Sequence, residues 1–150
     1  MSRSWKPSTR PGTSSVPDRL GNDVVVVDAS VMVDLLAGQD RAVAAEAALS
    51  DVRMVAPAHV DAEILSALGR LQRADILTTR QVTKLLADWV DAPIDRHTVT
   101  DLMAGAWRRR DDFRLTDALY VELAEQLGVP LVTSDRRLGR RYPAALVVEA

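Results

Sequence analysis

Cysteine is absent from this 150-residue chain, and histidine occurs only twice. The first absence excludes disulfide bonds, thiol nucleophiles and thiolate zinc sites, and the second excludes a histidine-rich metal centre. Aromatic residues make up only 4% of the chain, too few for the base stacking on which general single-strand binders depend. A chain without cysteine fits the reducing cytoplasm, which is where we expect the protein to act.

Long apolar runs are also missing. The longest candidate, Val24–Val27, is far shorter than the roughly 20 residues that a bilayer span needs. The basic residues near the start have no apolar stretch behind them, so neither a signal peptide nor a membrane partner is expected. Hydrophobic residues make up 47% of the chain, which excludes a wholly disordered protein and predicts one folded domain.

The formal net charge of −2 conceals an uneven distribution. Residues 1–22 carry four basic residues and one acid, a net +3, so the rest of the chain carries −5. An acidic body argues against a general nucleic-acid coating protein. Any anionic substrate would have to be held by local basic clusters or by metal ions.

Residues 1–22 are rich in Ser, Thr, Pro and Arg and lack apolar periodicity, so we interpret them as a flexible tail or an over-long start. Residues 23–150 are predicted to form the folded domain. There, short apolar runs alternate with helical patterns, which predicts an α/β fold. Its central sheet is expected to be mainly parallel, with four or five strands and helices on both faces.

The expected elements follow from periodicity and from turn residues. The predicted strands are Val24–Val27, Met54–Ala56, a brief strand at Ile94, Leu131–Thr133 and Leu146–Val148. The predicted helices are Val31–Ala37 with Ser30 as its cap, about Arg41–Leu49, two long patterns around 60–71 and 82–89, about Thr100–Asp111, and Asp117–Leu127 with Thr116 as its cap. Gly38 and Gly128 are expected to end two of these helices.

Four acidic residues occupy positions where a site is expected. Ligands of open α/β sheets collect outside the carboxyl ends of the strands, and Asp28 and Asp135 follow two of the predicted strands. Glu63 lies at the edge of the apolar stripe of a helix, where an unpaired Glu is rarely found. Asp117 opens another helix, although the helix dipole alone favours an acid there.

Four carboxylates at one sheet edge raise one another's pKa, so a shared site requires a cation. Mg²⁺ and Mn²⁺ prefer carboxylate and water oxygens and need neither Cys nor His. Such an ion would also allow an acidic body to accept a phosphate-bearing substrate. Four other acids are predicted to lie outside the site: Asp34, Asp61, Asp111 and Asp112.

In these segments the chain resembles the PIN-domain ribonucleases, and within them the VapC-type toxins of bacterial toxin–antitoxin pairs. The matching segments are 26–31 (VVDASV), 57–64 (PAHVDAEI), 115–120 (LTDALY) and 131–135 (LVTSD). Their ordered set covers about residues 24–149. The resemblance implies a Mg²⁺-dependent endoribonuclease, with Mn²⁺ as a possible substitute, that cleaves a cellular tRNA, rRNA or mRNA. It also implies a homodimer and a cognate antitoxin, both of which would contact helices within about residues 31–71.

The same resemblance assigns roles to individual residues. Asp28 and Asp117 would bind one or two metal ions directly, Glu63 would bind metal or orient water, and Asp135 would act partly through water. Ser30 and Thr133 match small hydroxyl positions near the pocket, where they would hold a ligand or a water.

Basic and aromatic residues complete the expectations. Four arginines that follow Asp135 are predicted to contact the RNA backbone: Arg136, Arg137, Arg140 and Arg141. Arg108–Arg110 are interpreted as a solvated face. His59 and His97 are expected at the surface or at strand ends, without a catalytic role. Trp89, Trp107 and Phe113 are expected in the core or in helix–helix contacts rather than as base-stacking platforms.

Two alternative functions remain open. The first is a phosphotransfer domain that uses Asp28 as its nucleophile. Haloacid-type phosphatases need a second acid two residues later, and this chain has Ser30 there. The second alternative is a catalytically inactive binding module with the PIN fold.

Overall fold

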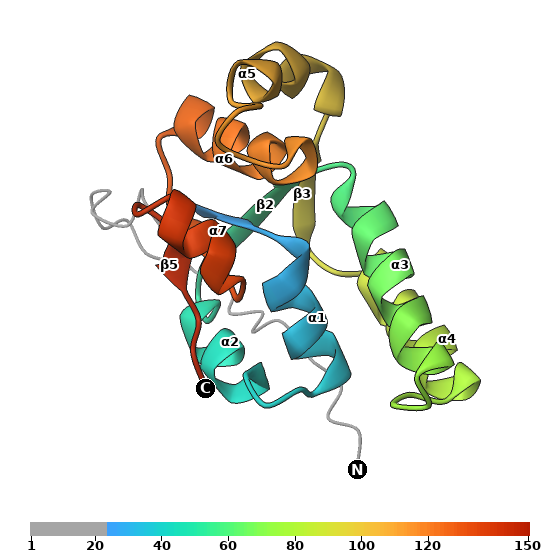
Figure 1. The fold of residues 1–150 in the computed structure, drawn as a ribbon. Helices are drawn as coiled ribbons and strands as arrows, with labels where there is room; N and C mark the ends of the chain where they lie inside the picture. Colours follow the sequence, from blue (N-terminus) through green and yellow to red (C-terminus); the bar gives the residue numbers. More distant parts are fainter. Residues whose placement is uncertain (1–23) are drawn as a thin grey trace, which may run out of the picture.

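The computed structural model describes residues 24–150, so the predicted tail at 1–22 lies outside the described residues. In this described part of the chain, five parallel strands form one sheet in the order β3-β2-β1-β4-β5 (Figure 1). They are β1 (Val24–Val27), β2 (Arg53–Pro57), β3 (Ile94–His97), β4 (Leu131–Thr133) and β5 (Leu146–Val147). The predicted α/β fold with a mainly parallel sheet is confirmed.

Within residues 24–150, seven α-helices and one 3-10 turn surround this sheet. The helices are α1 (Ala29–Ala37), α2 (Ala42–Ala48), α3 (Val60–Arg73), α4 (Thr79–Val90), α5 (Met103–Arg108), α6 (Leu115–Leu127) and α7 (Arg136–Arg141), and the turn is η1 (Val99–Leu102). In Figure 1, α5 and α6 lie above the sheet, α1 and α2 lie below it, and the α3–α4 pair stands to one side. No helix within residues 24–150 is long and apolar enough to cross a bilayer.

The central position of β1 follows from its composition. It pairs with β2 on one side and with β4 on the other, and Val25, Val26 and Val27 are buried. A continuous run of β-branched residues suits a parallel strand that is covered on both faces. This arrangement places Asp28, the next residue, in the middle of the carboxyl edge of the sheet.

Two helix starts differ from the prediction. Asp28 caps α1, because its carboxylate accepts a hydrogen bond from the backbone N–H of Val31 at 3.2 Å, and Ser30 lies inside the first turn. Helix α6 begins one residue before Thr116 and has no side-chain cap. The expected caps were therefore wrong, and both hydroxyl residues stand at the entrance to a pocket instead.

The expected helix over Thr100–Asp111 is divided into η1 and the short helix α5. Only Gly105 and Ala106 of α5 are buried, so Trp107 is 59% exposed rather than part of the core. Its ring instead lies under the guanidinium of Arg110, at 4.9 Å. Trp89 is buried and Phe113 packs partly against the core, as expected.

A buried carboxylate links α5 to α6. Glu122 is only 5% exposed, and it accepts hydrogen bonds from Arg109 Nη2 at 3.0 Å and from Gln126 Nε2 at 2.9 Å. Gly105 makes room for it, because a Cβ there would overlap the carboxylate. The Arg108–Arg110 segment is therefore only partly a solvated face, since Arg109 turns inward.

We expect Arg109→Ala to lower the free energy of unfolding by about 3 kcal/mol, because it leaves a buried carboxylate without its main counter-ion. Urea unfolding at pH 7 measures the change. Arg110→Ala is the matched control, since Arg110 contacts only the exposed Trp107 ring and its backbone carbonyl. The control should change stability by less than about 0.5 kcal/mol. Equal effects of the two variants would contradict the assignment.

Candidate active site

The carboxyl ends of β1 and β4 meet at one edge of the sheet. Val27 of β1 is in register with Val132 of β4, so Asp28 and Thr133 come next on adjacent strands. Thr133 Oγ1 donates to Asp28 Oδ2 at 2.6 Å across this edge. The structure thus brings the end of the first strand next to the segment that contains Asp135, as the sequence predicts.

Asp28 is buried beneath this edge, with 6% of its surface exposed. Its Oδ1 accepts hydrogen bonds from Ser30 Oγ at 2.6 Å and from the amide of Val31, and its Oδ2 accepts from Thr133. Burial raises the pKa of Asp28 to about 6 in spite of these three donors, and the charge of Asp117 adds to the rise. Ser30 and Thr133 therefore hold the Asp28 carboxylate itself.

Asp117 lies in the first turn of α6 and experiences the charges of its acidic neighbours. Burial raises its pKa first, and the negative charges of Asp135 and Glu63 raise it further. Arg114 and Arg137 act in the opposite direction. Since Asp117 also acts on Asp28, the four predicted acids form one electrostatically coupled group around Asp117.

Glu63 reaches the site from the first turn of α3. Its Oε1 is 2.8 Å from His59 Nε2 and accepts a hydrogen bond from the Tyr120 hydroxyl at 2.9 Å. Burial, and then the Glu63 charge, raise the pKa of Tyr120, so the phenol keeps its proton and acts as a donor. Asp61, the nearby acid on the same helix, pairs with Arg96 instead. Glu63 lines the pocket and Asp61 does not.

Asp135 caps α7, because its Oδ1 accepts from the amides of Arg137 at 2.8 Å and of Leu138 at 3.4 Å. Its own amide donates to Thr133 Oγ1 at 2.9 Å. In the same turn, the amide of Ser134 donates to Ser30 Oγ at 3.0 Å. A short network of hydroxyls thus joins the β4–α7 turn to the Asp28 carboxylate.

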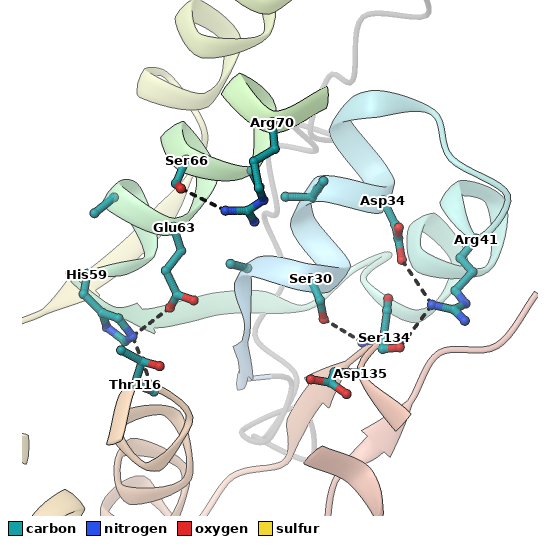
Figure 2. Close-up of a pocket in the computed structure, with 14 residues that line it drawn as sticks. Ser30, Asp34, Arg41, His59, Glu63, Ser66, Arg70, Thr116, Ser134 and Asp135 are labelled. Carbon is teal, nitrogen blue, oxygen red and sulfur yellow. Dashed lines mark hydrogen bonds and ion pairs between the residues drawn. The ribbon is translucent and has the colours of Figure 1, made fainter. Parts of the chain in front are cut away.

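Two pockets, called the larger and the smaller opening, share Asp135 as a lining residue. The larger is a pocket of about 710 Å³ between α1, α3 and the β4–α7 turn, with Glu63 and Asp135 on its wall (Figure 2). The smaller, of about 100 Å³, is lined by Asp117 and Asp135 together with Arg114, Arg137 and Arg141, among others. Asp28 lines neither opening and lies beneath them.

Several pocket residues were not predicted. His59, expected at the surface or at a strand end, lies just after β2 and is half-buried against Glu63. Asp34, expected outside the site, lies on the pocket wall beside Arg41 (Figure 2). Helical spacing could have identified both, because His59 is four residues before Glu63 and Asp34 is four residues after Ser30. Tyr120 is likewise three residues after Asp117 on α6, whereas Arg41 carries no such signal, because it stands just before α2 and reaches the site through the backbone carbonyl of Ser134.

The four arginines after Asp135 divide into two groups. Arg137 and Arg141 line the smaller opening, and Arg141 also donates to the backbone carbonyl of Asp112 at 2.6 Å. Arg136 pairs with Glu149 at 3.3 Å. Arg140 is exposed and is absent from both openings. The first pair is therefore the better placed to meet a substrate beside the acids.

The donor chemistry of the site suits a hard divalent cation. All four acids offer oxygen, and the pKa of Asp117 is raised by burial first and then by repulsion from Asp135 and Glu63, which a cation would relieve. Within residues 24–150, however, no three Asp, Glu or His side chains stand ready as a ligand set. Protein donors or close contacts engage both oxygens of Asp28, Oε1 of Glu63 and Oδ1 of Asp135, whereas no hydrogen bond from these residues reaches Glu63 Oε2.

Comparisons with known proteins place this geometry in context. Residues 25–142 match the PIN domain family. The chain is 57% identical over 122 residues to ribonuclease VapC3 of Mycobacterium tuberculosis, an alignment that spans 81% of this chain and 89% of the relative. Two solved structures share the fold. They are VapC20 of M. tuberculosis, a sarcin–ricin loop cleaving toxin (TM-score 0.61, 21% identity, 79% of this chain and 95% of that one), and a toxin–antitoxin complex from Klebsiella pneumoniae (TM-score 0.60, 14% identity, 83% and 98%).

Proposed function

Because this chain belongs to the PIN-domain family, and within it to the VapC-type ribonucleases, we propose that it is a divalent-metal-dependent endoribonuclease and the toxin of a toxin–antitoxin pair. The observation that carries the proposal is the coupled group of four acids at the carboxyl edge of the sheet. The identity to a named ribonuclease supports the reaction class. The reaction is hydrolysis of a phosphodiester bond in RNA.

We assign the metal ligands to the four acids. Asp28 and Asp117 would bind Mg²⁺ or Mn²⁺ directly, and Glu63 and Asp135 would complete the site through one oxygen or through water. When bound, a divalent cation neutralises phosphate charge and activates water for in-line attack. Ser30 and Thr133 hold the Asp28 carboxylate in place beneath the pocket. His59, on the pocket wall, contacts Glu63 and is not assigned as a catalytic base.

The arginines beside the acids support RNA as the substrate. Arg137 and Arg141 line the smaller opening next to Asp117 and Asp135, where their charges would meet the phosphates on one side of the scissile bond. Arg136 and Arg140 extend this basic region on α7. This arrangement lets a chain with a net negative charge hold a polyanion locally.

We also propose a cognate antitoxin as a partner, and a homodimer as the toxin's own state. A toxin–antitoxin complex is among the proteins that share the fold. Val43 on α2 and Leu65 on α3 are large exposed apolar residues in the stretch that we assign to these contacts. Light scattering of the purified chain measures the oligomeric state, and co-purification with the neighbouring gene product tests for the antitoxin.

The deciding experiment incubates the purified chain with total bacterial RNA and Mg²⁺ and maps the new 5′ ends. We expect cuts at a small number of sites, and we expect EDTA to abolish them. If no new ends appear with Mg²⁺ or Mn²⁺ at any protein concentration, the chain is an inactive binding module. If the chain instead takes up phosphate at Asp28 from a small phosphodonor, it is a phosphotransfer domain.

Arg137→Ala is expected to weaken RNA binding about equally for all sequences. It should also reduce the slope of log K against log salt concentration by about 1, as loss of one phosphate contact predicts. Fluorescence anisotropy of a labelled RNA in EDTA, where no cleavage occurs, measures both changes. Arg80→Ala removes an exposed arginine in the first turn of α4 and is the matched control. An unchanged salt slope in Arg137→Ala would remove this residue from the RNA path.

A further inference from the structure

We propose that His59 and Tyr120 are positioning residues that together hold one oxygen of Glu63, so that the other oxygen is presented to the pocket. The proposal rests on the proposed function of the site, because it explains how the acid from α3 is oriented for its task. Neither residue was predicted from the sequence to belong to the site.

One donated hydrogen bond and one close nitrogen contact meet at a single oxygen of Glu63. His59 Nε2 lies 2.8 Å from Glu63 Oε1, and the Tyr120 hydroxyl donates to the same oxygen at 2.9 Å. His59 stands just before α3, and Tyr120 projects from α6, 57 positions after Glu63. Glu63 is therefore held from its own helix and from the opposite face of the site.

Of the two ring nitrogens of His59, Nε2 carries the proton. His59 Nε2 faces two acceptors, Glu63 Oε1 and the backbone carbonyl of Thr116 at 3.2 Å. Since a carboxylate and a carbonyl can only accept, Nε2 must be the donor. Nδ1 is buried and has no hydrogen-bond partner in residues 24–150, so its side of the ring makes no competing bond. The Nε2 hydrogen is thus directed to the Thr116 carbonyl, and the same nitrogen lies 2.8 Å from Glu63 Oε1.

Packing restricts the side chains of both Tyr120 and His59. Tyr120 is only 1% exposed, and its ring packs against the imidazole with centroids 4.8 Å apart and planes tilted by 49°. Tyr120 is thus fixed within the core, and the partly buried His59 ring packs against it. Glu63, in contrast, is 35% exposed at its side chain and has a flexible stem, so without these contacts it would sample several rotamers.

This arrangement leaves the second oxygen of Glu63, Oε2, available to a ligand in the pocket. No hydrogen bond from residues 24–150 reaches Glu63 Oε2, whereas both oxygens of Asp28 are engaged. Figure 2 shows Glu63 beside His59 on the pocket wall. A carboxylate with one oxygen fixed and one free can contact a cation or a water through a single atom. Mutating a residue that orients a metal ligand typically lowers metal affinity or activity by about 10–100-fold.

The test uses Tyr120→Phe, which removes only the hydroxyl, and His59→Ala. Titration calorimetry should record Mn²⁺ affinity about 10-fold weaker for each variant, and cleavage should show a lower kcat with an unchanged KM for RNA. His59→Gln should recover most of the lost affinity, because its amide can donate from nearly the same position as Nε2. Tyr142→Phe is the matched control, since this hydroxyl donates to Glu125 at 2.8 Å on the surface, away from the site; it should behave as wild type.

Stability supplies a readout that does not depend on metal or activity. In EDTA, Tyr120→Phe should lower the melting temperature by about 3 °C, and the same change should have a much smaller effect when Glu63 is already Ala. If His59→Ala and Tyr120→Phe bind Mn²⁺ as wild type does, or if the two melting shifts are equal, the proposal is overturned. If wild type itself neither binds Mn²⁺ nor cleaves RNA, the proposed function fails, and the melting shifts still decide whether Tyr120 holds Glu63.

Discussion

Asp28→Asn is expected to abolish RNA cleavage and, at the same time, to stabilise the protein in the absence of metal. The loss of activity should be at least about 1000-fold, because an amide cannot supply the negative charge that a divalent cation requires at this position. The gain in stability follows from burial. The Asp28 carboxylate is 6% exposed, and its ionisation in that place is costly.

The sign of the effect follows from the pKa. Burial raises the pKa of Asp28 from 3.8 to about 6 in the folded protein, so between these values the folded state binds more protons than the unfolded state. Stability therefore falls as pH rises from about 4 to about 6, by about 3 kcal/mol in total. Above about pH 6 the wild type is destabilised by the full amount, because its buried carboxylate is ionised. The Asp28→Asn variant has no charge at this position and is not destabilised in this way.

Urea unfolding in EDTA between pH 4 and pH 8 measures this difference. We expect wild type and Asp28→Asn to diverge as pH rises, with the variant more stable at pH 8. Asp88→Asn is the control, because Asp88 forms an exposed ion pair with Lys84 on α4; it should leave both the pH profile and RNA cleavage nearly unchanged. A variant that is inactive but less stable than wild type at pH 8 would refute the electrostatic explanation.

Asp117→Asn is expected to remove the stabilisation that divalent cations give to the wild type. A ligand present at about 100 times its dissociation constant stabilises a folded protein by about 2.7 kcal/mol, which for a chain of this length raises the melting temperature by about 8 °C. Asp117 is the acid whose pKa is raised by both Asp135 and Glu63. Its removal should therefore relieve the repulsion and also weaken the cation site.

Differential scanning fluorimetry with and without Mn²⁺ measures this effect. Wild type should show a concentration-dependent rise in melting temperature, and Asp117→Asn should show almost none while melting at least as high as wild type in EDTA. Asp112→Asn, an exposed acid in the preceding loop, should keep the full response to Mn²⁺. A full response in Asp117→Asn would exclude this residue as a metal ligand.

Much of the fold could be predicted because it depends on local patterns. The β-branched run Val24–Val27 identified the central strand, and Gly38 and Gly128 were expected to end their helices. Both glycines adopt the left-handed conformation there, with φ of 62° and 64°. Helix starts were less predictable, because Asp28 and Ser30 are both good capping residues. In the structure Asp28 accepts the capping hydrogen bond from the Val31 amide, and the Ser30 hydroxyl donates to Asp28 instead.

The candidate site, like the fold, could be predicted from the sequence only in part. The positions of the four acids at strand ends and helix starts could be read along the chain, since they depend on element boundaries and on family motifs. The contacts of those acids could not be read in this way. Thr133 meets Asp28 across 105 positions, and Tyr120 meets Glu63 across 57, and such pairings depend on how the elements pack.

By itself, the sequence determined that this cysteine-free domain folds around a parallel sheet and carries acids where such sheets bind ligands. These properties arise from residue periodicity and chemistry over a few neighbouring positions. Only the tertiary structure decided that Asp28 is buried with a raised pKa, that the pocket and the arginine-lined opening meet at Asp135, and that His59 and Tyr120 share one oxygen of Glu63. The physical reason is that burial, electrostatic coupling and hydrogen-bond convergence depend on residues that only packing brings together.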